Sequence, residues 1–276
     1  ISAIWEYDGR APFDVLVRNP SFLRKLEHWI LPKMDGVIGV SEASAARVRG
    51  LVDTAKTRVG VVGNTPRIDK HMAGEESAVA EKVRGITGLK LLYVGWVTAG
   101  RGLSTVVQAL PEIQRRVGKV TLVVIGDGIG LEELRQEAEQ AGLSDSVYLA
   151  GWLDQQYVPN VIAATDVCLV PHYVDAHIDT TLPNKIYDYM LHSKPVVVTH
   201  SISLREFVED NQCGLWYHDK DLQELAKVIS QLADPDVAQR YGRKGYEAVQ
   251  SKLNWAADAD VLNDFVATIL EHGPRD

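Results

Sequence analysis

A proline-led stretch in the last third of the chain carries side chains suited to binding a phosphorylated ligand. It reads TTLPNKIYDYM over residues 180–190, and the apolar run 195–199 follows it. Pro183 suits the first position of a helix, where its missing N–H would have no intrahelical partner, so we predict that a helix begins there. The first-turn N–H groups of such a helix, together with its macrodipole, favour an anion such as a phosphate.

We expect the two charged side chains of this stretch to have separate roles. Asp188 lies one turn into the expected helix, where its carboxylate can accept hydrogen bonds from sugar or ribose hydroxyls. Lys185 lies at the helix start and is either a phosphate ligand or a surface lysine. An ordinary helix–strand unit with a proline at its start would look the same. The candidate ligand-binding residues of the stretch are Thr181, Leu182, Pro183, Asn184, Lys185 and Asp188.

Further candidates follow the apolar runs that we expect to form strands. In a parallel sheet covered by helices, the ligand lies at the carboxyl ends of the strands. The residues selected on this ground are Gly95, Arg101 and Gly102 after the first run, Gly126 after the second, Trp152 after the third and His172 after the fourth. Arg101 can bind phosphate in a forked geometry, or it is a solvated arginine at a helix start.

Two patterns among these loops are weak evidence for a ligand. The segment GDGIG at 126–130 is not G-x-G-x-x-G, so it is as consistent with a tight strand-to-helix turn as with a dinucleotide site. His172, His177 and Asp179 lack the spacing of a metal site, and we predict no bound metal.

The strands that position these loops are predicted by six short apolar runs separated by amphipathic helical stripes. Runs that are apolar on both faces, with helices between them, indicate a parallel sheet covered on both sides. The six runs are residues 91–94, 120–125, 147–149, 167–170, 195–199 and 214–216.

The beginning of the chain predicts a smaller α/β unit. We expect strands at 3–7, 35–42 and 58–64, a helix over 21–30, and a second helix that Ser41 caps and that continues through Val48. Phe22, Leu26 and Trp29 are spaced for one buried helix face. These elements are too few for a complete domain. Residues 66–88 have no clear apolar stripe and are the best linker candidate.

The composition narrows the class of protein. With 276 residues, 46% hydrophobic and 24% charged, the chain can form one large or two modest domains. A net charge of −8 argues against nucleic-acid binding, which needs a basic face. No apolar run approaches the roughly 20 residues of a membrane span. Cys168 and Cys213 show neither metal-ligand nor disulfide-rich spacing, so we expect core thiols and a cytoplasmic protein.

The order of these segments resembles the retaining GT-B glycosyltransferases of the large family 4. PNKIYDYM at 183–190 and KPVVV at 194–198 resemble that family's P-x-K-x-x-E-Y-M and G-x-P-V-V. DGVIGVSE at 35–42 and VGVVGN at 59–64 resemble D-x-V-I-x-V-S-E and V-x-V-V-x-N, which close the N-terminal domain of the family. The resemblance covers nearly the whole chain from Asp35 onward.

The resemblance implies a nucleotide-sugar donor and no bound metal or other cofactor. It implies that Arg101 contacts the donor diphosphate, that the turn at Gly126 lies beside the nucleoside, and that Trp152 lies near the nucleobase, where it stacks or simply packs. The chain departs from the family at two places. Trp96 stands where the family has the first of two basic residues. Thr180 and Asp188 stand where the family has a pair of glutamates.

We therefore predict an α/β protein of GT-B architecture with two Rossmann-like parallel-sheet domains, the N-terminal one incomplete. Residues 1–66 are expected to be the C-terminal part of the acceptor domain, 67–88 a linker, 89–252 the donor-binding domain and 253–276 a helix crossing back. The expected reaction moves a sugar from a UDP- or GDP-sugar to a glycan, lipid-linked or polysaccharide acceptor with retention of configuration. Peripheral membrane association and self-association through the incomplete domain are left open.

Two other functions fit the same sequence. A GT-B nucleotide-sugar epimerase would use this fold, but it needs several carboxylates and histidines that converge in the cleft. A non-catalytic nucleotide-sugar-binding module is favoured by the missing first glutamate and the missing arginine. Donor turnover separates a transferase from a binder.

Donor binding should survive the removal of divalent cations, because no carboxylate or histidine spacing in the sequence builds a cation site. Calorimetric titration with a nucleotide sugar, with and without EDTA, measures this. A requirement for manganese or magnesium would count against the GT-B prediction.

Overall fold

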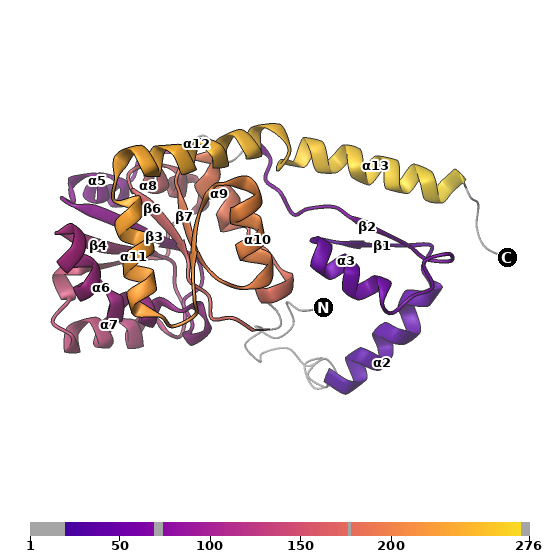
Figure 1. Ribbon diagram of the computed structural model, residues 1–276, viewed down its shortest axis with the longest axis horizontal. Helices are drawn as coiled ribbons and strands as arrows, with labels where there is room; N and C mark the ends of the chain where they lie inside the picture. Colours follow the sequence, from indigo (N-terminus) through magenta and orange to yellow (C-terminus); the bar gives the residue numbers. More distant parts are fainter. Residues whose placement is uncertain (1–19, 69–73, 176–177, 272–276) are drawn as a thin grey trace. The chain divides into compact units, whose positions relative to one another are not determined.

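The structure is a computed structural model that describes residues 20–68, 74–175 and 178–271 (Figure 1). The chain divides into two compact units, residues 1–63 with 258–276, and residues 64–257. Each unit contains a parallel sheet of its own. The strand expected at 3–7 lies outside the described residues.

The smaller unit is built on two parallel strands, β1 (Gly36–Gly39) and β2 (Arg58–Val61). Helix α13 (Trp255–Glu271) packs on them through Phe265. A Cβ atom on Gly36 or Gly60 would lie 2.9 or 2.7 Å from the Phe265 ring, so glycine at both positions lets the helix approach the strands closely.

Helix α3 (Glu42–Arg49) begins as the sequence predicts. The Ser44 N–H donates to the Ser41 hydroxyl at 3.1 Å, and the Ser41 N–H donates to the Ser44 hydroxyl at 3.0 Å. This reciprocal pair is a capping box, which satisfies two N–H groups that the first turn leaves without helical partners.

The face by which helix α2 (Pro20–Ile30) packs was predicted wrongly. The expected apolar face is exposed, with Phe22 at 43%, Leu26 at 37% and Trp29 at 62%. The buried side chain is Glu27, whose carboxylate accepts hydrogen bonds from the Arg47 guanidinium of α3, and these bonds lower the pKa of Glu27. A polar pair with another helix thus decides which face is buried, and helical spacing alone does not show this.

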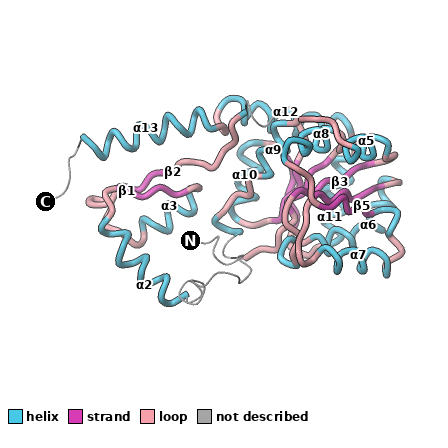
Figure 2. Tube along the Cα trace, turned by 180° about the vertical axis from the view of Figure 1, so that it is seen from behind, coloured by secondary structure: helices cyan, strands magenta, loops and turns pink. Residues whose placement is uncertain are grey.

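The larger unit contains the six-stranded parallel sheet that the sequence predicts. Its order is β5-β4-β3-β6-β7-β8, so the chain builds outward from β3 in one direction and then, from β6, in the other (Figures 1 and 2). The strands are β3 (Leu89–Val94), β4 (Val120–Ile125), β5 (Val147–Gly151), β6 (Val167–Val170), β7 (Val196–Thr199) and β8 (Gly214–Tyr217). The topological switch point is the boundary between β3 and β6, where ligands of such sheets bind.

Helices cover both faces of this sheet, and each face has its own hydrophobic core. Successive strand residues alternate between the two cores: Leu91 and Tyr93 belong to one, and Leu92 to the other. The first face carries α6 (Leu103–Val117), α7 (Leu131–Gln140) and α11 (Leu222–Leu232). The second carries α5 (Ala78–Gly85), α8 (Val158–Ala163), α9 (Lys185–Leu191), α10 (Ile202–Asn211) and α12 (Pro235–Ser251).

The segment expected to be a linker, residues 67–88, contains one of these covering helices. Ser77 caps α5 by accepting from the Ala80 N–H at 3.1 Å, and Ala80 and Val83 are fully buried in the second core. The expectation that this segment has no apolar face is therefore corrected for residues 78–85. Its stripe consists of small side chains on two turns, too few to stand out in the sequence.

Both cysteines lie in the core of this unit, as expected. Cys168 on β6 and Cys213 just before β8 are fully buried, and burial raises the pKa of each thiol to about 12. Both thiols are therefore protonated and inert at neutral pH. Among the described residues, none of the helices is both long and apolar enough to cross a membrane.

Helix α9 is tied to the end of β3 by a hydrogen bond inside the second core. The Val94 N–H donates to the hydroxyl of the fully buried Tyr189 at 2.9 Å. Tyr189→Phe should lower the free energy of unfolding by about 1 kcal/mol, because it leaves the partly buried Val94 N–H without its acceptor. Urea denaturation followed by circular dichroism measures the loss. Tyr246→Phe, at a half-buried position of α12, is the matched control and should stay within about 0.5 kcal/mol of the parent; equal losses in both variants would contradict the role of this bond.

Candidate ligand site at the carboxyl ends of the strands

Three neighbouring strands end in glycines whose backbones touch. Gly95 follows β3, Gly126 follows β4 and Gly151 ends β5, and all three have positive φ. The Gly95 N–H donates to the Ile125 carbonyl at 2.9 Å, and the Gly126 N–H donates to the Gly151 carbonyl at 2.8 Å. A Cβ atom on Gly126 would lie 1.9 Å from the Gly95 carbonyl oxygen, so only glycine allows this approach.

The GDGIG segment forms a tight turn that is joined to the loop after β3. The Val97 N–H donates to the Asp127 carbonyl at 2.8 Å, and the Gly130 N–H donates to the Val97 carbonyl at 3.1 Å. A Cβ on Gly128 would lie 2.1 Å from that same Val97 oxygen. The spacing of the glycines therefore serves this loop-to-loop contact.

The loop that carries Arg101 is attached to the loop after β6. Arg101 ends the 3₁₀ helix η3 (Ala99–Arg101), and Gly102, at φ 68°, precedes α6. The Tyr173 N–H donates to the Gly100 carbonyl at 2.9 Å, and a Cβ on Gly102 would lie 1.8 Å from the Pro171 oxygen. The structure thus joins the loops that follow β3 and β6, the two strands at the switch point.

Helix α9 places Lys185 against the end of β3. The Lys185 ammonium lies 3.9 Å from the centre of the Tyr93 ring and 2.8 Å from the position of a Cβ atom on Gly95. The Tyr93 hydroxyl donates to the Trp96 carbonyl at 2.9 Å, which fixes the same loop. Lys185 and Gly95 are far apart in sequence, and the fold brings them together at the switch point.

The start of α9 differs from the prediction by two residues. The helix begins at Lys185, and Asn184, in helical conformation, precedes it. The Ile186 N–H donates to the Pro183 carbonyl at 3.0 Å, and the Tyr187 N–H to the Asn184 carbonyl at 3.0 Å, so a turn with three-residue spacing leads into the helix. Thr181 and Leu182 lie in the non-helical segment before that turn.

His172 and Asp179 occupy structural positions in the loop after β6. His172 is 1% exposed, its ring centre lies 6.3 Å from that of Tyr93, and its carbonyl accepts from the Thr199 hydroxyl at 2.7 Å. The Asp179 carboxylate accepts from the Ile202 N–H at 2.9 Å and so holds this loop to the start of α10. His177, the third residue weighed as a metal ligand, lies outside the described residues.

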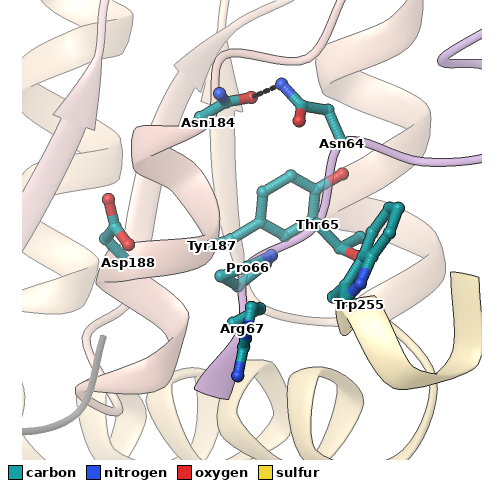
Figure 3. A pocket seen from close by; sticks show the side chains of 8 residues that line it. All are labelled: Asn64, Thr65, Pro66, Arg67, Asn184, Tyr187, Asp188 and Trp255. Atoms are coloured by element: carbon teal, nitrogen blue, oxygen red, sulfur yellow. Dashed lines mark hydrogen bonds between the residues drawn. The ribbon is translucent and has the colours of Figure 1, made fainter. Parts of the chain in front are cut away.

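Asp188 is among the residues that line a cavity of about 270 Å³ beside α9 (Figure 3). The Asn64 side-chain amide donates to the Asn184 side-chain oxygen at 3.0 Å. The backbone N–H of Trp255 donates to the Pro66 carbonyl at 3.0 Å. The lining residues are Asn64, Thr65, Pro66, Arg67, Asn184, Tyr187, Asp188 and Trp255. In Figure 3, Tyr187 lies between Asp188 and the side chains of Thr65 and Trp255.

Sequence reasoning did not select Asn64, Arg67 or Trp255 as site residues. Asn64 ends a segment used only for the family resemblance, and Trp255 begins the last helix. The fold brings both to α9. No local pattern marks such a meeting of distant segments.

The predicted residues outside the segment 181–184 fall into three groups. Gly95, Gly102, Gly126, Lys185 and His172 gather around the end of β3, in the contacts given above, with Arg101 on the loop between Gly95 and Gly102. Trp152 follows β5 and is 72% exposed, so the alternative that it simply packs is wrong. Asp188 lies one helical turn beyond Lys185 and opens on the cavity of Figure 3.

This combination of a six-stranded parallel sheet and glycine loops at its carboxyl edge is found in the GT-B fold, to which the chain belongs. Sucrose-phosphate synthase from Thermosynechococcus elongatus matches it with a TM-score of 0.74, at 24% identity, over 99% of this chain and 66% of that one. HepE from Anabaena, solved in complex with UDP, matches with a TM-score of 0.76, at 18% identity, over 91% of this chain and 68% of that one.

The chain belongs to the family described as glycosyl transferases group 1, whose model matches residues 88–234, more than half of the sequence. A GDP-mannose-dependent alpha-(1-6)-phosphatidylinositol monomannoside mannosyltransferase of Mycobacterium tuberculosis is 31% identical over 169 residues, covering 60% of this chain. The 2-deoxystreptamine glucosyltransferase of Streptomyces kanamyceticus is 24% identical over 257 residues, covering 91% of this chain. The matches span only 44% and 63% of those two relatives.

Gly102→Ala should destabilise the protein more than Gly142→Ala does, because the two glycines share a conformation and differ in their surroundings. Their φ angles are 68° and 69°, so alanine costs about 1–2 kcal/mol of strain at either position. Of the two, Gly102 is where the new Cβ meets a backbone atom, the Pro171 oxygen, whereas no atom of the described residues lies within 4 Å at Gly142. Urea denaturation of both variants measures the difference, and equal losses would show that the contact between the two loops is not tight.

Proposed function

We propose that this chain is the donor-binding part of a glycosyltransferase that moves a sugar from a nucleotide sugar to a glycan, lipid-linked or polysaccharide acceptor. The observation that carries the proposal is the position of the Lys185 ammonium beside Gly95. This is the end of β3, where the order in which strands are added to the sheet reverses. The family match and the transferase names of both curated relatives support the same reaction class.

The chemical demand of this reaction is the departure of a nucleoside diphosphate from the anomeric carbon. Fixed cations and N–H dipoles aimed at the developing negative charge lower the barrier. Lys185 from α9 would supply one cation and Arg101 from the loop after β3 another. The loop contacts at Gly95 and Gly102 would hold both backbones in place before the donor arrives. We infer that no metal ion is needed for this step.

Retention of configuration and membership of family 4 are the finer parts of the proposal. They rest on the resemblance of residues 183–190 and 194–198 to the family motif. The same resemblance implies that Asp188 on α9 binds ribose hydroxyls through its carboxylate. It also implies that the first-turn N–H groups of this helix face the diphosphate.

A non-catalytic binding protein is the second candidate, favoured by two residues. Trp96 replaces a basic residue beside the expected diphosphate, and Thr180 replaces an acid. Both candidates predict nucleotide binding, so turnover separates them. Transfer of the sugar to an added acceptor, with release of the nucleoside diphosphate, would establish a transferase, and binding without turnover would establish the alternative.

Arg101→Ala should weaken nucleoside diphosphate binding about tenfold or more and leave nucleoside binding nearly unchanged. One hydrogen bond to a charged group contributes about 1.5–3 kcal/mol, and each 1.4 kcal/mol is tenfold in affinity. Asp188→Ala should weaken nucleoside and nucleoside diphosphate alike if its carboxylate binds ribose. Isothermal titration calorimetry with both ligand types measures the two patterns.

A third variant, Arg135→Ala, is the matched control because Arg135 lies on the exposed side of α7. It should bind both ligand types as the parent does. Should Arg101→Ala and Asp188→Ala also bind every nucleotide like the parent while remaining folded, the donor site lies elsewhere on the molecule.

A further inference from the structure

Another cavity, of about 550 Å³, lies in the smaller unit and has two arginines in its lining. Arg49 is the last residue of α3, and Arg58 is the first residue of β2. The other lining residues are Thr54, Val59, Phe265 and Thr268. None of these described lining residues carries a carboxylate, although the chain as a whole has a net charge of −8. A cavity whose charged groups are both guanidinium groups favours an anion.

The elements place this cavity at the amino end of the small sheet. Helices α3 and α13 cover opposite faces of the sheet (Figures 1 and 2), and both contribute lining residues. The two arginines come from the point where α3 has ended and β2 begins. Substrates of parallel α/β sheets bind at the carboxyl ends of the strands. This cavity is therefore a candidate site for a ligand other than the substrates.

One carboxylate beside the cavity shares the charge of Arg49. The Arg49 Nη1 group donates to the Glu42 carboxylate, and the Glu42 side chain is 71% exposed. A guanidinium group has five N–H donors in a planar fork, so one carboxylate does not use its whole hydrogen-bonding capacity. Exposed ion pairs of this kind contribute little to stability, so Arg49 can turn toward a more strongly charged anion at little cost.

The uncharged lining residues fit a polar molecule attached to the anion. The Phe265 ring is held against the sheet, since a Cβ atom on Gly60 would lie 2.7 Å from it, and it forms an apolar wall with Val59. The Thr268 hydroxyl donates to the Asp264 carbonyl at 2.7 Å, and its oxygen can accept a hydrogen bond from a ligand. Thr54 contributes a second hydroxyl. Inorganic phosphate alone would use the guanidinium groups and leave this wall uncovered.

We propose that this cavity is a second binding site, for a phosphate monoester of a small hydroxylated molecule such as a hexose. Arg49 and Arg58 bind the phosphate oxygens in a forked geometry, the threonine hydroxyls contact the hydroxyls of the ester, and Phe265 covers its apolar face. The inference goes beyond the proposed function and does not depend on it. Every lining residue belongs to the smaller unit, whereas the loops of the proposed donor site belong to the larger one.

The test is calorimetric titration of the full chain with glucose 1-phosphate, glucose 6-phosphate, inorganic phosphate and glucose. The parent should bind the two esters more tightly than inorganic phosphate, and glucose least tightly of the four. Arg49→Ala and Arg58→Ala should each weaken ester binding about tenfold or more, because each removes a charge-assisted contact. Glu42→Gln should tighten ester binding, because Arg49 is then no longer shared with a carboxylate; weaker binding in this variant would contradict the inference.

Arg24→Ala is the matched control, since Arg24 is an exposed arginine on α2 of the same unit and is not a lining residue. It should bind both esters as the parent does. Arg101→Ala should also leave ester binding unchanged while it weakens nucleoside diphosphate binding. If Arg58→Ala does not fold, Arg58→Lys replaces it: lysine keeps the charge but lacks the fork, so ester binding should still weaken.

Three results would overturn the inference. They are no binding of either ester by the parent at millimolar concentrations, unchanged ester affinity in folded variants of Arg49 and Arg58, and loss of ester binding in Arg101→Ala, which would place the esters at the loops of the larger unit. Ester binding by a parent that binds no nucleoside diphosphate would remove the proposed function and leave this inference standing.

Discussion

The close approach of backbones at the carboxyl edge of the larger sheet is the constraint on which the rest of the site depends. The Gly95 oxygen lies where a side chain of residue 126 would begin, and the Pro171 oxygen lies where a side chain of residue 102 would begin. Loops packed in this way hold one another without side chains between them. The positions of these loops are therefore fixed by contacts between backbone atoms and not by flexible side chains.

Two buried tyrosines connect the end of β3 to helix α9, which carries Lys185. Tyr189 of α9 accepts from the Val94 N–H, and Tyr93 of β3 lies under the Lys185 ammonium and donates to the Trp96 carbonyl. The strand end, the loop after it and the helix start thus share one small set of contacts. A cation over an aromatic face is attracted to it even without an anion present, so Lys185 is oriented in the absence of ligand.

Charged and aromatic side chains occupy different ends of this edge. Lys185 lies against the end of β3, and the exposed Trp152 directly follows β5. Lys185 and Arg101 are the cations that our proposal uses. Because the two come from α9 and η3, the site depends on the tertiary contacts between these elements more than on any single motif.

The sequence by itself determined the α/β class, the six strands of the larger sheet and their parallel direction, because strands that are apolar on both faces need helices on both sides. It also determined the capped start of α3. Only the tertiary structure decided which face of α2 is buried, since the partner of Glu27 is an arginine on another helix. It likewise decided that α9 begins at Lys185 and that Lys185 meets Gly95, whereas Asp188 opens on a cavity with Asn64 and Trp255. These are contacts between segments far apart in the chain, and local spacing carries information only about neighbours within a few residues.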